Sequence, residues 1–150
     1  MSTREARADE VWRRLFQFFM YSRPQRDKAL ADAGLTPNDM RTLSALHGTD
    51  GRTMRSLADE WSCDPSNVTW VVNRLEKLGL VRRRKSSDDN RVRLVALTPA
   101  GSKMLARVVD RMWRSPRELL ELSSADLETL RAILMKLPAA GKTFGIKATR

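Results

Sequence analysis

The chain has 150 residues, 41% of them hydrophobic and 31% charged, and its 28 Lys and Arg outnumber its 18 Asp and Glu to give a formal net charge of +10. This length and composition suit one globular domain over residues 1–150, and no apolar run approaches the ~18 residues that a membrane span needs. The positive charge favours a polyanionic partner, while a charged start and the single cysteine, Cys63, predict a cytoplasmic protein without an intrachain disulfide.

The first predicted element is a helix over residues 8–21. Apolar side chains cover most of its circumference, so more than one partner surface is needed to bury them. Pro24 ends this helix, and a charged connecting stretch follows. Thr36 as N-cap and Pro37 as first residue then predict a second helix to about residue 47.

A helix-turn-helix is predicted next. Residues 53–61 carry apolar side chains at helical spacing, and Asp64 as N-cap with Gly79 as the stop delimits a second, longer helix. The predicted buried face of this longer helix consists of Val68, Val71, Val72, Leu75 and Leu78. Only two residues separate the pair, so the chain must turn sharply there, and the second helix would read DNA.

A basic hairpin follows the helix-turn-helix. Residues 80–85 and 91–97 each show the pattern of a strand, with a polar turn between them. Residues 80–93 include six basic and two acidic side chains, which concentrates positive charge on the hairpin. We therefore predict a mainly α fold with a small β-hairpin wing, a winged helix-turn-helix. A long helix from residue 99 to about 113 and a last helix from Ser123 to about Leu137 complete the chain.

Four segments between Leu35 and Leu105 share a recognisable pattern: LTPNDMRTLSAL, MRSLADEW, DPSNVTWVVNRLEKLGLVRR and DDNRVRLVALTPAG. Together they resemble the MarR family of bacterial transcriptional regulators. The most specific element is Asp-x-Arg followed by alternating aliphatic residues and Leu-Thr, at residues 89–98. The resemblance implies a DNA-binding core at residues 35–98, flanked by dimerisation helices at residues 8–23 and 99–137, in a homodimer.

The resemblance also implies how the wing contacts DNA. In this family a wing arginine enters a minor groove, so Arg91 would be that residue and Asp89 its orienting partner, with Arg82 and Arg84 as further wing contacts. A carboxylate can hold a guanidinium in one direction through charge-assisted hydrogen bonds. In the alternative interpretation, Asp88 and Asp89 only shape the turn and the basic residues are solvated.

The solvent-facing side of the recognition helix supplies the residues that would read the major groove. Asn side chains favour adenine, Arg favours guanine, and hydroxyl groups suit either. The candidates are Ser66, Asn67, Thr69, Trp70, Asn73 and Arg74. Polar residues on a helix exterior are often merely solvated. For Trp70, packing beneath the wing is the alternative to contact with a thymine methyl group or sugar edge.

A ligand site is implied by the resemblance alone. Family members bind small aromatic acids between the dimer layer and the winged helix, where Trp12, Phe16, His47 and Met112 are the candidate lining. The simpler interpretation makes these residues core, with His47 near a carbonyl group at its helix end. Cys63 is likewise expected to be a small core residue rather than a redox sensor.

Catalysis, a metal and a cofactor are not expected. One His and one Cys provide neither a zinc cluster nor a nucleophile with its base. Residues 140–145 superficially resemble a phosphate loop, but Lys136 stands where that loop needs a glycine.

The sequence therefore predicts a homodimeric, sequence-specific regulator that binds a pseudo-palindromic operator in double-stranded DNA. By resemblance it would be a repressor that a small aromatic ligand releases. The alternatives are a nonspecific architectural DNA-binding protein and a winged helix whose basic wing meets an acidic protein.

Overall fold

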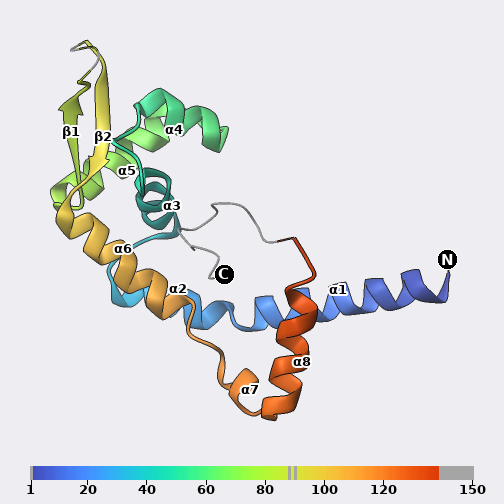
Figure 1. The fold of residues 1–150 in the computed structure, drawn as a ribbon. Helices are drawn as coiled ribbons and strands as arrows, with labels where there is room; N and C mark the ends of the chain where they lie inside the picture. The colour runs from blue at the N-terminus through green and yellow to red at the C-terminus, as the bar shows by residue number, and fades with distance from the viewer. Residues whose placement is uncertain (1, 88, 90, 139–150) are drawn as a thin grey trace.

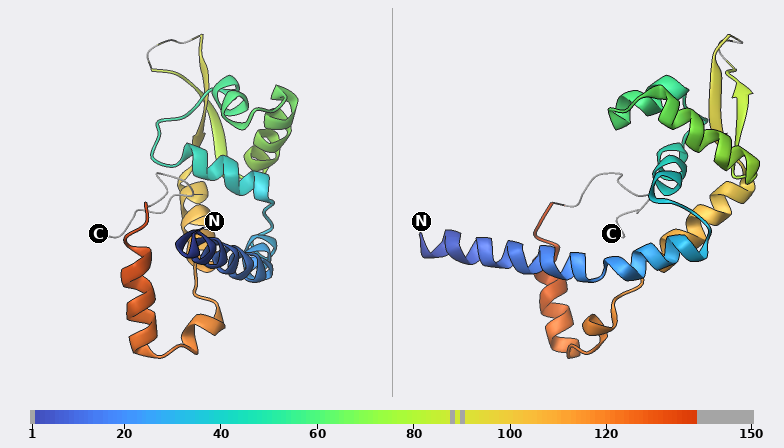
Figure 2. Two further views of the ribbon diagram at one scale, coloured as in Figure 1. Left: turned by 90° about the vertical axis from the view of Figure 1, so that its right-hand side faces the viewer. Right: turned by 180° about the vertical axis from the view of Figure 1, so that it is seen from behind.

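The computed structural model describes residues 2–87, 89 and 91–138 (Figure 1). Its elements are α1 (Thr3–Tyr21), α2 (Arg23–Asp32), α3 (Pro37–Leu46), α4 (Met54–Trp61), α5 (Pro65–Lys77), β1 (Val81–Lys85), β2 (Arg93–Leu97), α6 (Pro99–Met112), α7 (Arg117–Leu120) and α8 (Ser124–Leu134). The hairpin and α3 to α5 lie at one end of the molecule, α1, α7 and α8 lie at the other, and α6 runs between them (Figures 1 and 2). No helix in the described part of the chain is long and apolar enough to cross a lipid bilayer.

The winged helix-turn-helix is confirmed, and α3 and α5 start directly after Thr36 and Asp64, the N-caps that the sequence predicted. The side chains of Thr36, Thr53, Asp64 and Thr98 each accept a hydrogen bond from a backbone amide in the first turn of the helix that follows. β1 and β2 are antiparallel, with Val81 opposite Leu97 and Lys85 opposite Arg93. The apolar faces of α3, α4, α5 and α6 meet the inner face of this hairpin in one core.

The loop between α3 and α4 is attached to the wing, which the sequence did not predict. Arg52 and Val95 exchange two backbone hydrogen bonds of 2.8 Å each, as in an antiparallel bridge. Gly51 precedes this bridge with a φ of 126°, and a Cβ atom there would lie 2.9 Å from the carbonyl oxygen of Val95. The loop therefore extends the hairpin as a third strand would.

The first two helices differ from the prediction. α1 begins at Thr3 rather than near residue 8, because Ser2 and Glu5 form a capping box. The predicted connecting stretch after Pro24 is wrong, since residues 23–32 form α2, which packs against α6. Proline is tolerated in the first turn of a helix, where its missing N–H group would have no helical partner.

Three details at helix ends also differ. The predicted burial of Leu78 is wrong: the residue is 48% exposed, because α5 ends at Lys77 and Leu78 lies beyond the last buried turn. A short helix, α7, follows Pro116. α8 ends at Leu134, so it is shorter than the predicted helix to Leu137.

Helix α6 begins in close contact with the end of α5. The Thr98 amide donates to the carbonyl oxygen of Leu80 at 3.1 Å, and the Thr98 hydroxyl donates to that of Gly79 at 2.6 Å. Gly101 lies on the same side, and a Cβ atom there would overlap with the Leu80 carbonyl group. Only glycine therefore lets the two segments approach so closely.

We predict that Gly101→Ala lowers the free energy of unfolding by about 3 kcal/mol, the upper end for overpacking, because a backbone carbonyl group cannot move aside. The better helix propensity of alanine offsets only about 1 kcal/mol of this loss. Urea denaturation measures the effect, with the exposed neighbour Ser102→Ala as control. Equal stability of the two variants would contradict the close contact.

Candidate nucleic-acid interface

Helix α5 exposes the predicted reading face. Val68, Val71, Val72 and Leu75 are buried, and this fixes the opposite side of the helix toward solvent. The exposed side carries Ser66, Asn67, Thr69, Trp70 and Asn73. The Trp70 residue is 62% exposed, so it does not pack beneath the wing. A large aromatic group in this position is available for contact with a partner.

Hydrogen bonds at the start of α5 decide what its hydroxyl groups can offer. Asp64 accepts from the Ser66 side chain and from the Ser66 amide, the latter at 2.7 Å, and these bonds hold the pKa of Asp64 below its ordinary value. The Thr69 hydroxyl donates to the Pro65 carbonyl oxygen at 2.9 Å. The Thr69 hydroxyl proton is thus used within the helix, and its oxygen remains as an acceptor.

Arg74, the sixth predicted reading residue, is bound within the fold. Its guanidinium donates to the Gly34 carbonyl oxygen at 2.7 Å and lies 3.2 Å from the carboxylate of Asp39, which is fully buried. The same Asp39 carboxylate accepts from the Thr36 amide at 2.8 Å. In this arrangement the Arg74 guanidinium faces α3 rather than the exposed side of α5.

The arginines of β1 point alternately to two sides of the hairpin. Arg83 faces α5, where it forms an ion pair with Glu76 and donates to the Asn73 side-chain oxygen at 2.6 Å. Arg82 and Arg84 lie on the other side, and the Arg84 Nε donates to the Asp50 carbonyl oxygen at 3.1 Å. The wing is therefore bonded to α5 on one side and to the α3–α4 loop on the other.

The tip of the wing shows the turn-shaping contact of the alternative interpretation. Asp89 accepts a hydrogen bond of 2.8 Å from the backbone amide of Arg91. The carboxylate thus acts on the main chain that carries Arg91, instead of on the guanidinium as the resemblance implied. The Arg91 side chain is exposed. Asp88 lies outside the described residues.

A hollow of about 240 Å³ beside the start of α5 adds a basic residue that sequence reasoning missed. It is lined by Asn38, Arg41, Trp61, Cys63, Asn67, Trp70 and Val71. The Arg41 guanidinium lies over the Trp61 ring, 5.0 Å from its centre. Cys63 is half-buried and packs against the core, as expected of a small core residue. Arg41 had no distinguishing sequence signal, because only the fold brings α3 next to Asn67.

The four candidate ligand residues are not brought together within one chain. Met112 borders an apolar hollow of about 320 Å³ between α1, α2, α6 and α7, together with Phe18 and Trp113. Trp12 and Phe16 are exposed on α1, and His47 is exposed at the end of α3 near the base of the wing.

Comparison with known proteins gives a consistent picture. A family model described as MarR family matches residues 33–91. A protein of Thauera aromatica, designated a transcriptional regulatory protein for the hcr operon, is 32% identical over 105 residues, which are 69% of this chain and 63% of that protein. The Bacillus subtilis transcriptional repressor MdtR is 26% identical over 126 residues, 83% of this chain and 81% of the relative. The chain therefore spans just under two thirds of the length of the Thauera aromatica protein.

Solved structures share the fold. A multiple antibiotic-resistance repressor from Listeria monocytogenes has a TM-score of 0.77 at 20% identity, with 89% of this chain and 95% of that chain covered. The S. aureus MepR protein in a complex with DNA has a TM-score of 0.63 at 25% identity, with 81% and 93% covered. The curated relatives and the family are regulators of transcription rather than enzymes, in agreement with the sequence-based expectation.

Proposed function

This chain belongs to the MarR family, and from that premise we propose that it is a homodimeric, sequence-specific DNA-binding regulator of transcription in the cytoplasm. The observation that carries the proposal is the exposed polar face of α5 beside a basic wing. A helix of this kind fits the major groove, while the wing reaches the neighbouring minor groove.

The contacts divide into reading and positioning. Asn67 and Asn73 present amide groups that suit adenine, and Trp70 presents an apolar surface that suits a thymine methyl group. Arg91 enters the minor groove, where a guanidinium responds to groove width. Arg82, Arg84 and the newly found Arg41 face phosphate groups and set the orientation of the protein.

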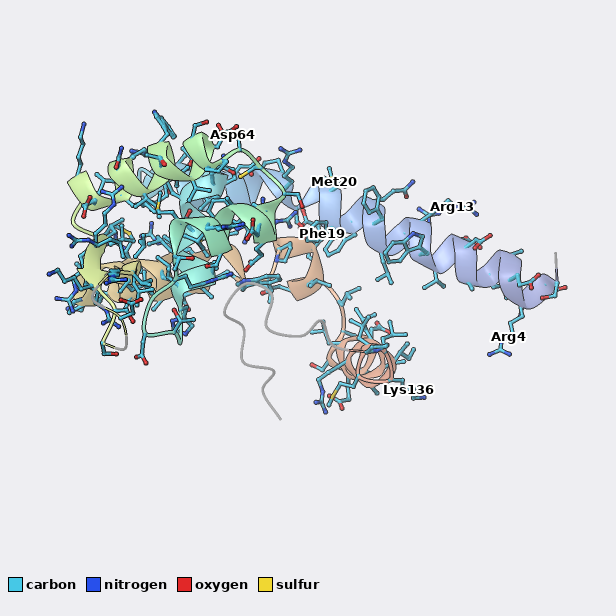
Figure 3. All side chains as sticks on the ribbon, turned by 90° about the horizontal axis from the view of Figure 1, so that it is seen from above. Arg4, Arg13, Phe19, Met20, Asp64 and Lys136 are labelled. Carbon is cyan, nitrogen blue, oxygen red and sulfur yellow. The ribbon has the colours of Figure 1, made fainter. Side chains whose placement is uncertain are left out.

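The exposed apolar side chains of α1 support the proposal of a second copy of the chain. No residue of this helix is buried, and the Trp12 and Phe16 residues are 68% and 54% exposed. Figure 3 shows the first half of α1, from Arg4 to Arg13, extending away from the rest of the chain. A two-fold partner would cover this surface and place two α5 helices about 34 Å apart, one turn of DNA.

Repression and release by a ligand form the finer part of the proposal. The relative named as a repressor, MdtR, supports repression. A small aromatic acid fits the hollow beside Met112, because its lining is largely apolar and includes Arg26, whose guanidinium lies 3.9 Å from the centre of the Phe19 ring. Titration of the protein–operator complex with salicylate tests this part. If salicylate leaves the affinity for the operator unchanged, only the proposed ligand is discarded.

A footprint on the DNA upstream of the protein's own gene tests the function. A protected pseudo-palindrome is the expected result. Uniform coating would instead indicate an architectural protein, and the absence of protection would leave a protein-binding winged helix.

We predict that Arg91→Ala weakens binding to the protected site by about 1 to 3 kcal/mol, the size of a good groove contact, without a change in melting temperature. Fluorescence anisotropy with a labelled duplex measures the affinity. Arg93→Ala is the matched control, because it removes the same charge from the strand instead of the tip. Unchanged affinity in Arg91→Ala would exclude the wing from recognition.

A further inference from the structure

A polar hollow of about 490 Å³ lies at the base of the wing, on the side away from α5. Its polar lining consists of His47, Thr49, Asp50, Arg82, Arg84 and Ser102. These side chains come from the α3–α4 loop, from β1 and from the first turns of α6. Small residues leave the space open, since Ala96 stands opposite Arg82 in the strand register and Gly48 lies in the loop.

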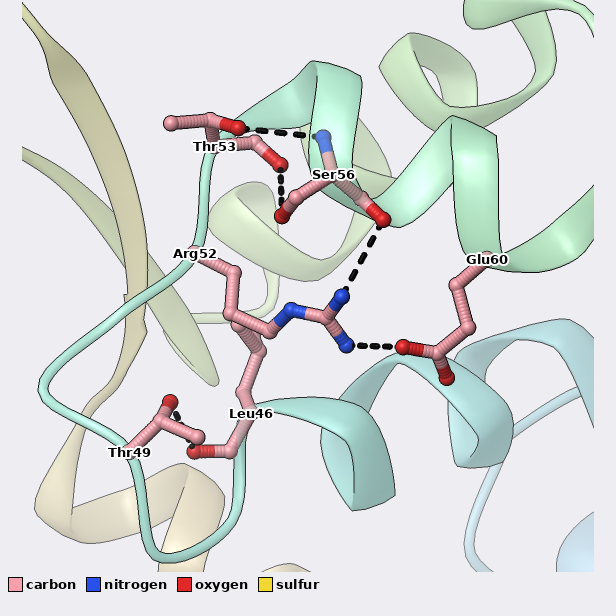
Figure 4. Close-up of polar contacts among 6 residues, drawn as sticks. All are labelled: Leu46, Thr49, Arg52, Thr53, Ser56 and Glu60. Carbon is pink, nitrogen blue, oxygen red and sulfur yellow. Dashed lines mark hydrogen bonds and ion pairs between the residues drawn. The ribbon is translucent and has the colours of Figure 1, made fainter.

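The loop wall of this hollow is held by its own hydrogen bonds. The Thr49 hydroxyl donates to the Leu46 carbonyl oxygen at 2.8 Å. Arg52, whose main chain forms the bridge to Val95, donates from its side chain to the Ser56 carbonyl oxygen at 3.1 Å and forms an ion pair with Glu60 (Figure 4). The shape of the hollow therefore does not depend on an occupant.

The hollow has an excess of positive charge. Arg83, on the α5 side of the same strand, is neutralised by Glu76, whereas Arg82 and Arg84 form no ion pair with any residue that the structure describes. Arg84 donates to the main-chain carbonyl groups of Asp50 and Lys85, which carry no net charge. Two guanidinium groups thus face the single carboxylate of the lining, that of Asp50.

Helix α6 adds to the positive electrostatic potential of the hollow. It has 14 residues, and its first turn contains no acidic side chain, so the positive end of its dipole is uncompensated by a side chain of that turn. Ser102 is exposed and presents a hydroxyl group to the hollow from this end of the helix.

We propose that this hollow binds a phosphate-type oxyanion, which Arg82 and Arg84 hold by charge and to which the Ser102 hydroxyl donates a hydrogen bond. Guanidinium groups match the paired oxygens of such an anion, and a helix start favours it further. The anion is either a free phosphate group or a phosphate of the DNA backbone. The first source is independent of the proposed function, and the second rests on it.

Binding of inorganic phosphate to the full chain, followed by ³¹P NMR in a phosphate-free buffer, tests the site without DNA. Ser102→Asp should weaken this binding by about tenfold or more, because it adds a carboxylate to the lining, and Arg82→Gln should do the same. Lys103→Gln, which removes a positive charge next to the lining but not from it, is the control and should stay within about twofold. An aspartate near a helix start does not impair folding, and thermal unfolding checks this.

A second measurement distinguishes the two sources of the anion. The salt dependence of duplex binding should lose about one unit of slope in Arg82→Gln if the hollow holds a backbone phosphate. If Ser102→Asp weakens phosphate binding and Arg82→Gln leaves the salt dependence of duplex binding unchanged, the anion is a free phosphate. If the protein binds no duplex but binds phosphate, the proposed function fails and the site stands. Phosphate binding that is absent or equal in all variants, together with an unchanged slope, overturns the proposal.

Discussion

Replacement of Arg74 by methionine is expected to lower the free energy of unfolding by about 3 kcal/mol, near the lower end for a broken buried ion pair. The substitution leaves the fully buried Asp39 carboxylate without its cationic partner. The lower end applies because the Arg74 side chain is itself 30% exposed, so water compensates part of the loss. Methionine keeps the length and helix propensity of the side chain, which confines the change to the charge and its hydrogen bonds.

Urea denaturation of Arg74→Met, Asp39→Asn and the double variant measures this coupling. The double variant should be more stable than the sum of the two single losses predicts, because each single change already breaks the pair. Lys77→Met, at an exposed position three residues further along α5, is the matched control and should change stability by less than about 0.5 kcal/mol. If Arg74→Met is as stable as the unsubstituted protein but prefers different DNA bases, Arg74 contacts DNA instead of holding Asp39.

The parts of the fold that the sequence predicted are those with local physical causes. An N-cap followed by proline marks the start of α3, α5 and α6, because the cap satisfies an amide group only two or three residues away. The spacing of Val68, Val71, Val72 and Leu75 likewise fixes the exposed face of α5 without knowledge of the rest of the chain. The reading face could therefore be located before its surroundings were known.

The features that sequence reasoning missed depend on residues far apart in the chain. Arg74 was assigned to the exposed face by its place on the helix, but Asp39, 35 positions earlier, holds it toward α3. Nothing local distinguishes Arg83, which forms an ion pair with Glu76, from Arg82 and Arg84, which form none within the part of the chain that the structure describes. The bridge between Arg52 and Val95 also joins distant segments, and only the assembled fold shows that the loop forms one wall of the hollow at the wing.

The four predicted ligand residues do not share one site within the chain. Trp12, Phe16, His47 and Met112 were grouped through a family resemblance, and within one chain they lie in separate places. Trp12 and Phe16 belong to the exposed apolar side of α1, so their surroundings depend on what covers that helix. The role of Trp12 and Phe16 therefore depends on whether a second copy of the chain covers α1.

The full chain is expected to sediment at twice its 17.1 kDa mass, and the double substitution Trp12→Glu and Phe16→Glu is expected to convert it to a monomer. Both side chains are exposed within the chain, so the change adds two carboxylates to the proposed interface without removing core packing. Operator affinity should fall by about a hundredfold or more, because the two half-sites are then bound independently.

Gln17→Glu is the matched control for this substitution, because it introduces the same charged group on the polar side of α1, between Arg13 and Arg14 around the helix. It should leave both the sedimentation and the operator affinity unchanged. Circular dichroism should show that the doubly substituted protein keeps its helices, since α1 begins with its own capping box at Ser2 and Glu5. An unsubstituted chain that sediments as a monomer would contradict the dimer, and tight operator binding by such a monomer would show that one α5 helix with its wing suffices for recognition.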